Sequence, residues 1–251
     1  DPVSTFSIDV DTASYVNARM FLAANDAPPV EAIRVEEFIN YFTYTYSEPG
    51  SGENVALATE TMLSPWSTNE LAPTLLIKVN VKGRTIADSA RKDAHLVLLL
   101  DVSGSMAAGN KLPLLQQALK KFITRLRPSD KISLVTYADR VSTVLDNVDA
   151  SNPGLPLAID ALVAAGLTAG EDGLATAYQI ARAHFITNGV NRVFVATAGD
   201  FNLGGRTKDG IVEFARTEAA DNIFMTILGV GRSTADQTFL DSLAQRAQGQ
   251  F

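Results

Sequence analysis

The stretch Ala94-His95-Leu96-Val97-Leu98-Leu99-Leu100-Asp101-Val102-Ser103-Gly104-Ser105-Met106 indicates the fold of the larger part of this chain. Its first part, residues 95–100, is almost wholly apolar, which is typical of a strand buried on both faces of a parallel sheet. Its second part places a carboxylate and two hydroxyls directly after that strand. Because open α/β sheets bind ligands at the carboxyl ends of their strands, the sequence predicts a binding site here.

Strand-like and helix-like segments alternate after this stretch. We therefore predict a doubly wound, mainly parallel α/β sheet flanked by helices, of the Rossmann-like kind. Only three residues separate the second and third predicted strands, so that pair is expected to form a hairpin. The predicted strands are 95–100, 132–137, 141–145, 192–197 and 223–229, and the predicted helices are 111–126, 156–163, 172–185, 208–220 and 235–248.

Residues 1–92 follow a different pattern and predict a smaller α+β leader region before a larger domain of residues 93–251. Residues 82–93 are polar and charged, and we interpret them as the linker. Because this linker has no Gly/Ser-rich or Pro-rich tract, we expect the leader region to pack on the larger domain. The leader is predicted to hold one helix to about Ala24, a second starting at Pro28-Pro29, and strands at 55–62 and 74–81.

Composition excludes several classes of protein. The 251 residues include 21 Lys and Arg and 28 Asp and Glu, so the net charge of −7 argues against nucleic acid as the main partner. No cysteine is present, which excludes disulfides and thiolate metal sites. No apolar run approaches the ~20 residues of a membrane-spanning helix. The chain opens at Asp1 without a signal segment, so we expect a fragment or a processed product.

Asp101, Ser103 and Ser105 are three oxygen donors spaced two residues apart. Hard oxygen donors suit Mg²⁺, Mn²⁺ or Ca²⁺ rather than zinc or copper. Gly104 allows the tight bend that would turn both hydroxyls toward one point. A site so rich in hydroxyls carries little negative charge, so a bound ion stays electrophilic and can recruit a carboxylate from a partner. The alternative is a Ser/Gly turn that binds nothing.

Residues 101–106 resemble the Asp-x-Ser-x-Ser motif of von Willebrand factor type A (VWA) domains, the metal-ion-dependent adhesion site (MIDAS). The stretch Gly166-Leu167-Thr168-Ala169-Gly170 resembles the loop that supplies the metal-binding threonine of the family, which implies a role for Thr168. Residues 192–202 resemble the fourth strand of the family and its following loop. Residues 4–15 (STFSIDVDTASY) and 34–42 (RVEEFINYF) resemble the leader region of bacterial VWA proteins of the YfbK type.

One position departs from the family pattern. VWA domains usually have Thr-Asp-Gly where this chain has Thr197-Ala198-Gly199, and Ala198 has no donor atom. Since even indirect changes around a metal cost ~10–100-fold in affinity, we expect a loss at least that large. Asp200, two residues further on, is the candidate replacement if the backbone stays extended.

The resemblance implies a non-catalytic adhesion-type module. It would hold a divalent cation, Mg²⁺ first with Mn²⁺ or Ca²⁺ as alternatives, and bind a protein that offers an Asp or Glu side chain. Proteins of this type belong to the bacterial cell envelope, often as lipoproteins, so an anchor is expected upstream of Asp1. The fold normally ends with one more edge strand, and we expect that strand to be missing here or supplied by another segment.

A second function remains open at Asp9-Val10-Asp11-Thr12. This spacing matches the nucleophile motif of metal-assisted phosphohydrolases, in which Asp9 would attack phosphorus and Asp11 would act as acid and base. The simpler interpretation is that Asp11 or Thr12 caps the first helix. The two histidines, His95 and His184, are expected to be structural, since neither pairs with a serine as a general base.

Overall fold

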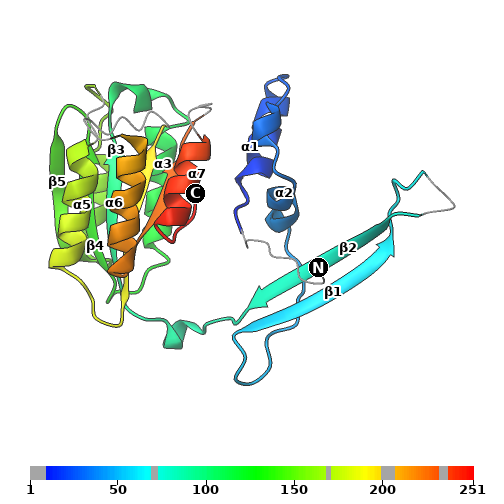
Figure 1. The fold of residues 1–251 in the computed structure, drawn as a ribbon. Helices are drawn as coiled ribbons and strands as arrows, with labels where there is room; N and C mark the ends of the chain where they lie inside the picture. Colours follow the sequence, from blue (N-terminus) through cyan, green and yellow to red (C-terminus); the bar gives the residue numbers. More distant parts are fainter. Residues whose placement is uncertain (1–9, 69–72, 168–170, 199–206, 232–236) are drawn as a thin grey trace. The chain divides into compact units, whose positions relative to one another are not determined.

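The fold was analysed in a computed structural model that describes residues 10–68, 73–167, 171–198, 207–231 and 237–251 (Figure 1). The chain divides into two compact units, Asp1–Arg91 and Lys92–Phe251, and each is described by itself. Packing of the leader region on the larger domain stays a prediction. Within the described residues, every helix is too short or too polar to cross a membrane.

The larger unit is built on a five-stranded sheet with the order β5-β4-β3-β6-β7. The strand β3 is parallel to both β4 and β6, β6 is parallel to β7, and only the edge strand β5 runs antiparallel. This confirms the predicted doubly wound, mainly parallel sheet and the hairpin between β4 and β5. The strands are β3 (Ala94–Asp101), β4 (Lys131–Tyr137), β5 (Val141–Asp149), β6 (Val190–Thr197) and β7 (Ile223–Gly229).

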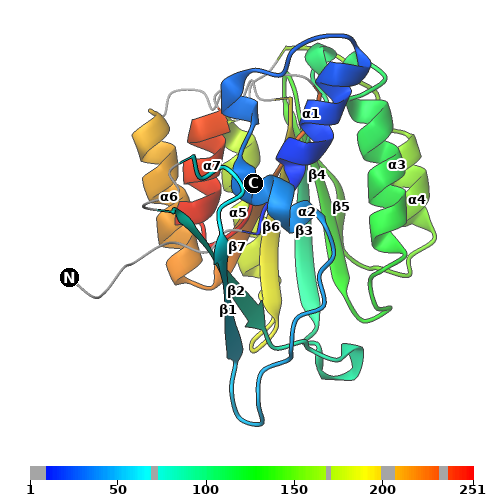
Figure 2. The ribbon, with the colours of Figure 1, turned by 90° about the vertical axis from the view of Figure 1, so that its right-hand side faces the viewer.

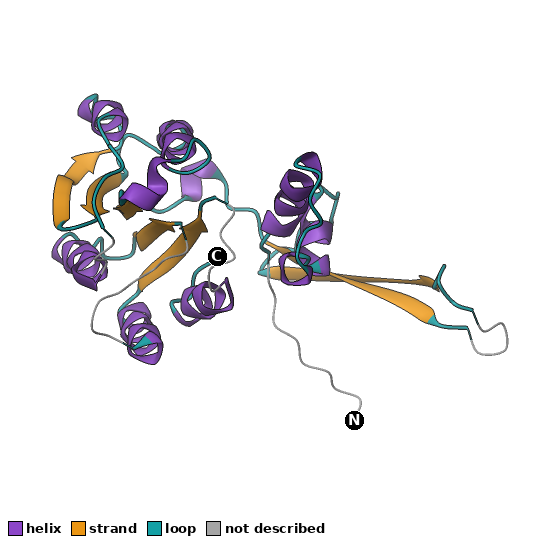
Figure 3. Ribbon diagram, turned by 90° about the horizontal axis from the view of Figure 1, so that it is seen from above, coloured by secondary structure: helices purple, strands orange, loops and turns teal. Residues whose placement is uncertain are grey.

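Helices cover both faces of this sheet (Figures 2 and 3). One face packs against α3 (Leu112–Ile123) and α4 (Gly154–Asp160), and the other packs against α5 (Glu171–Ala183), α6 (Lys208–Ala220) and α7 (Gln237–Arg246). Alternate residues of β3 explain why its sequence is apolar throughout. Leu96, Leu98 and Leu100 belong to the core on the α3 side, and Val97 and Leu99 belong to the core on the α5 side.

The strand β7 lies at one edge of the sheet. Residues after α7 run beside it, because the amides of Met225 and Ile227 donate to the carbonyls of Ala247 (3.2 Å) and Gln250 (2.8 Å). The ring of Phe251 packs against the core on the same side as α7. The expectation of a missing last edge strand stays a prediction.

The first unit contains two helices that are joined by a buried carboxylate. Glu37 in α2 (Val35–Tyr41) is 4% exposed, and it accepts from the amide of Ser14 (2.8 Å) at the start of α1 (Ala13–Ala23). The predicted start of the second helix at Pro28-Pro29 is wrong. The backbone of Pro29 and that of Ile33 are extended, so a 3₁₀ turn of only three residues, Val30–Ala32, fits between them.

The remainder of this unit is an antiparallel hairpin of β1 (Val55–Leu63) and β2 (Leu75–Gly83). One face lies against the preceding segment, where the Lys78 ammonium is 5.2 Å from the ring of Tyr44 and 5.7 Å from that of Tyr46. The other face carries the alternating apolar residues of β2, and Ile77 on that face is 62% exposed.

Candidate metal centre

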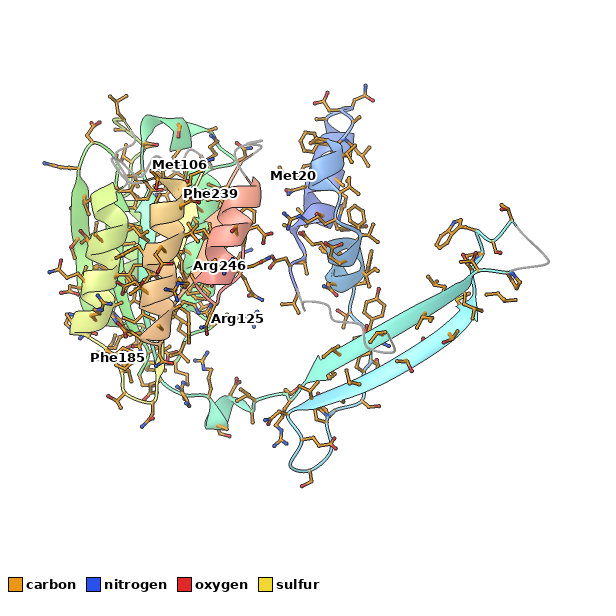
Figure 4. All side chains as sticks on the ribbon, in the orientation of Figure 1. Met20, Met106, Arg125, Phe185, Phe239 and Arg246 are labelled. Atoms are coloured by element: carbon orange, nitrogen blue, oxygen red, sulfur yellow. The ribbon has the colours of Figure 1, made fainter. Side chains whose placement is uncertain are left out.

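The predicted donors follow β3 at the end of the sheet where Met106 is labelled in Figure 4. Asp101 is the last residue of β3, and the amide of Val102 still donates to the Tyr137 carbonyl of β4 (3.0 Å). A short 3₁₀ turn, Gly104–Ala107, then bends the chain. Its Met106 side chain is fully buried in the core beside α3, which anchors the turn over the sheet.

The structure places the three candidate donors in one turn at the end of β3. Asp101 is fully buried, and its Oδ1 accepts from the amide of Ser103 (2.8 Å). The hydroxyls of Ser103 and Ser105 lie 3.0 Å apart. The second carboxylate oxygen, Oδ2 of Asp101, is buried and has no hydrogen-bond partner within the part of the chain that the structure describes. Buried polar atoms are nearly always paired, so this oxygen indicates a ligand position.

Burial is the main influence on the Asp101 carboxyl, and it raises the pKa of that group. Hydrogen bonds from Ser103 and from the backbone amide of Ala198 act in the opposite direction, and so does the charge of Lys111. The Lys111 ammonium donates to the Ser105 carbonyl (3.0 Å), which places a cation at the rim of the donor group. A divalent cation would stabilise the ionised carboxylate far more strongly than these groups do.

A second loop lies against the donors. The amide of Gly104 donates to the Gly166 carbonyl (2.9 Å), and the amide of Ala165 donates to the Val102 carbonyl (2.8 Å). The structure therefore brings the loop that precedes Thr168 to the predicted site. Thr168 and Asp200 themselves lie outside the described residues, so their roles as ligands stay predictions.

Ala198 follows β6 and is 2% exposed, and it belongs to the core cluster that contains Met106. A hydrogen bond from its backbone amide lowers the pKa of Asp101. Its methyl side chain has no atom that could bind a metal. Among the described residues, no three His, Asp or Glu side chains come close enough to hold a metal together. Among the described residues, the candidate donors at this end of the sheet are therefore one carboxylate and neutral hydroxyls, which is the donor set of a hard, partly charged site.

The alternative phosphohydrolase site is only partly visible, because Asp9 lies outside the described residues. Asp11 lies directly before α1, whose N-cap position is Thr12. The Thr12 side chain makes no capping hydrogen bond, so that form of the simpler interpretation is wrong. The buried carboxylate of Glu37 accepts from the first turn of α1 in its place.

His95 does contact a serine, but the contact is buried and does not contradict the expectation that both histidines are structural. His95 Nε2 lies 3.0 Å from the hydroxyl of Ser133, and His184 Nε2 lies 3.2 Å from Asp146. Ser133 is fully buried and its hydroxyl accepts from the amide of Asn147 (2.9 Å), so this hydroxyl is not exposed to a substrate as a nucleophile. This cluster lies at the opposite end of β3 from Asp101 and is structural.

Sequence reasoning missed two residues at the site, Lys111 and Asp139. Asp139 accepts from the amide of Leu167 (2.5 Å) and so contacts the loop that leads to Thr168. The strand order carries the signal that would have found it. Asp139 follows β4, which is parallel to β3 and next to it, so the residues after both strands meet at one edge of the sheet.

Comparisons with known proteins agree with this fold. The family model for the von Willebrand factor type A domain matches residues 96–201, and a further model described as von Willebrand factor matches residues 1–72. The manganese-loaded TRAP protein of Plasmodium vivax has a TM-score of 0.51 at 14% identity, covering 76% of this chain and 67% of that one. Proximal thread matrix protein 1 of the mussel byssus, with a zinc-occupied MIDAS motif, has a TM-score of 0.52 at 21% identity, covering 64% and 41%.

The curated relative YfbK of Escherichia coli K12, an uncharacterized protein, is 36% identical over 258 residues. That match covers all of this chain and 44% of YfbK, so the chain spans less than half the length of this relative. The likeness extends through both units, the leader region included. The chain belongs to the VWA-domain proteins of the YfbK type.

Proposed function

We propose that this chain is a non-catalytic protein-binding module that captures an Asp or Glu side chain of a partner through a divalent cation. The cation would be held by Asp101, Ser103 and Ser105 at the carboxyl end of β3. Thr168 and Asp200 are the further candidate ligands. Mg²⁺ is the first candidate ion, with Mn²⁺ and Ca²⁺ as alternatives.

The unpaired Oδ2 of Asp101 is the observation that carries this proposal. A fully buried carboxylate oxygen without a hydrogen-bond donor is costly, and a cation is the ligand that relieves that cost most directly. The adjacent hydroxyls of Ser103 and Ser105 supply the neutral oxygens that a hard cation needs beside one carboxylate.

Charge favours an acidic partner. With Ala198 in place of the usual aspartate, one described carboxylate faces a divalent cation, and Lys111 adds a further positive charge at the rim. With Asp101 as its one charged ligand, the cation would keep a net positive charge and would attract a carboxylate from a partner.

The family resemblance supports a bacterial envelope location, with an anchor outside residues 1–251. The proposed surface for the partner is the loop edge formed by residues 101–107 and 165–167. These two segments are held together by the paired backbone hydrogen bonds of Gly104 and Ala165.

Calorimetric titration of Mn²⁺ and Mg²⁺ into metal-stripped protein tests the proposal, with Asp101→Asn as the decisive variant. Asparagine keeps the shape of the side chain and removes the charge, so we expect at least a tenfold loss of affinity. Asp149→Asn is the matched control, because this carboxylate is 57% exposed and pairs with Lys131 on the surface. A parent chain that binds neither ion at millimolar concentration would overturn the metal site.

A further inference from the structure

Asp139 lies in the three-residue turn between β4 and β5, outside the Asp-x-Ser-x-Ser motif. It is exposed, so it contributes little to the core. Because β4 is the direct neighbour of β3, the turn that holds Asp139 lies at the same edge of the sheet as Asp101. A charged side chain at this place can act on the site without being one of its predicted ligands.

The carboxylate of Asp139 is bound to the second loop of the site. Its Oδ1 accepts from the amide of Leu167. Gly166, the preceding residue, has a φ of +81°, and a side chain there would collide with the Asp139 carboxylate. The carboxylate therefore occupies the space that glycine leaves open, and it restrains this loop.

The loop passes this restraint to the donors. The carbonyl of Gly166 accepts from the amide of Gly104 (2.9 Å), and a Cβ on Gly104 would lie 3.2 Å from the same carbonyl oxygen. Gly104 stands between Ser103 and Ser105, so this hydrogen bond restrains the backbone of the turn that carries both hydroxyls. One chain of contacts thus runs from Asp139 through Gly166 to the donor turn.

We propose that Asp139 is a positioning residue of the metal centre: it holds the Gly166-Leu167 segment, which in turn holds the Gly104 peptide and the hydroxyls on either side. The expected effect on metal affinity rests on the proposed function. The contacts themselves are independent of any ion. The role depends on the hydrogen-bond acceptor at Asp139, and the negative charge is secondary.

Two variants of the full chain separate the acceptor from the charge. Asp139→Ala removes both, and we expect Mn²⁺ affinity to fall ~10–100-fold, the range for residues that orient metal ligands. Asp139→Asn keeps an oxygen acceptor for the Leu167 amide, so its Mn²⁺ affinity should stay within about threefold of the parent. An Asn variant as weak as the Ala variant would overturn the proposal, because the charge would then be the cause.

Amide hydrogen exchange of the metal-free chain provides a second readout. In Asp139→Ala, exchange should accelerate at Leu167 and at Gly104, while amides in the centre of β3 stay protected.

Mn²⁺ affinity tests the proposed metal-binding function, and amide hydrogen exchange tests the positioning role of Asp139 separately. If the parent chain binds no Mn²⁺, the proposed function fails, and the exchange data alone then decide the role of Asp139. Unchanged exchange at Gly104 in Asp139→Ala would overturn that role in every case.

Discussion

The substitution Ala198→Asp would restore the carboxylate that most VWA domains carry at this position. The backbone amide of Ala198 already donates a hydrogen bond to the Asp101 carboxylate, so residue 198 lies next to this candidate metal ligand. Its side chain is 2% exposed and lies in the core cluster with Met106. A new carboxylate therefore has two environments open to it, the apolar core or the coordination sphere of a cation.

The two environments give opposite effects on stability. Without metal, two buried carboxylates lie close together, and a pKa raised by ~2 units would cost about 2.7 kcal/mol at pH 7. With metal, a gain of ~10–100-fold in affinity returns about 1.4–2.7 kcal/mol at saturating ion. For a chain of this size, each 1 kcal/mol moves the melting temperature by roughly 2–4 °C. The variant should melt below the parent in chelator, and its metal-induced rise should exceed that of the parent by roughly 3–11 °C.

Thermal unfolding with and without 1 mM Mn²⁺, together with calorimetric titration, measures both effects on the same samples. Ala198→Asn is the matched control, since it has similar volume and no charge, and its metal-induced rise should be clearly smaller. Suppose Ala198→Asp folds but binds Mn²⁺ no more tightly than the parent. Residue 198 is then not the vacant ligand position, and the idea that its missing carboxylate weakens metal binding is refuted.

Three further outcomes are expected. Replacing Lys111 by Met removes a cation from the rim, so Mn²⁺ affinity measured by titration should rise several-fold at low salt, and this gain should vanish as salt screens the charge. Replacing Glu37 by Ala leaves the amide of Ser14 without its carboxylate acceptor, so α1 should lose about 1–3 kcal/mol of stability, measured by amide hydrogen exchange. The control is Glu36→Ala, because the Glu36 side chain is exposed. Burial, with His184 as the second cause, lowers the pKa of His95 to about 4, below its ordinary 6.5. The unfolded chain therefore binds more protons than the folded chain between pH 4 and 6.5. The free energy of unfolding, measured with denaturant, should be at its full value above pH 6.5 and fall by up to ~3 kcal/mol toward pH 4. The decrease should be smaller in His95→Gln.

The periodicity of the larger unit predicted its fold well because each element buries a continuous face. Residues of β3 alternate between two apolar cores, and no other secondary structure gives that pattern. The ends of helices were predicted less well. The predicted helix 111–126 stops at Ile123, where the amides of Arg125 and Leu126 turn to carbonyls three residues back. Such tightening depends on the following loop, which helical periodicity does not encode.

The first unit shows a different reason for failure. Its strands β1 and β2 were both predicted, the second with apolar residues on alternate positions, and both strands form. Alternation shows that one face differs from the other, but it does not show which face is covered. In this hairpin the polar face lies against the aromatic segment with Tyr44, and the apolar face with Ile77 is exposed.

The candidate metal centre was partly predictable because its proposed donors are close in sequence. Asp101, Ser103 and Ser105 lie within one turn, so their convergence follows from local spacing. Asp139 lies 38 residues from Asp101 and reaches the site only through the pairing of β3 with β4, which the motif does not reveal. Residues that hold ligands in place therefore require the strand order, whereas the ligands themselves require only the motif.

Position 198 connects these observations. Its side chain has lost the donor, yet its backbone amide still stabilises the ionised Asp101, as does the amide of Ser103. Main-chain groups thus hold the carboxylate in place without help from any side chain at position 198. We therefore expect the architecture of the site to be separable from its affinity for metal: a substitution at residue 198 should change how tightly a cation binds, while the strand, the turn and the buried carboxylate persist. The same separation explains how one VWA framework can accommodate donor sets of different strength, because the framework is stabilised by its two cores and its backbone hydrogen bonds.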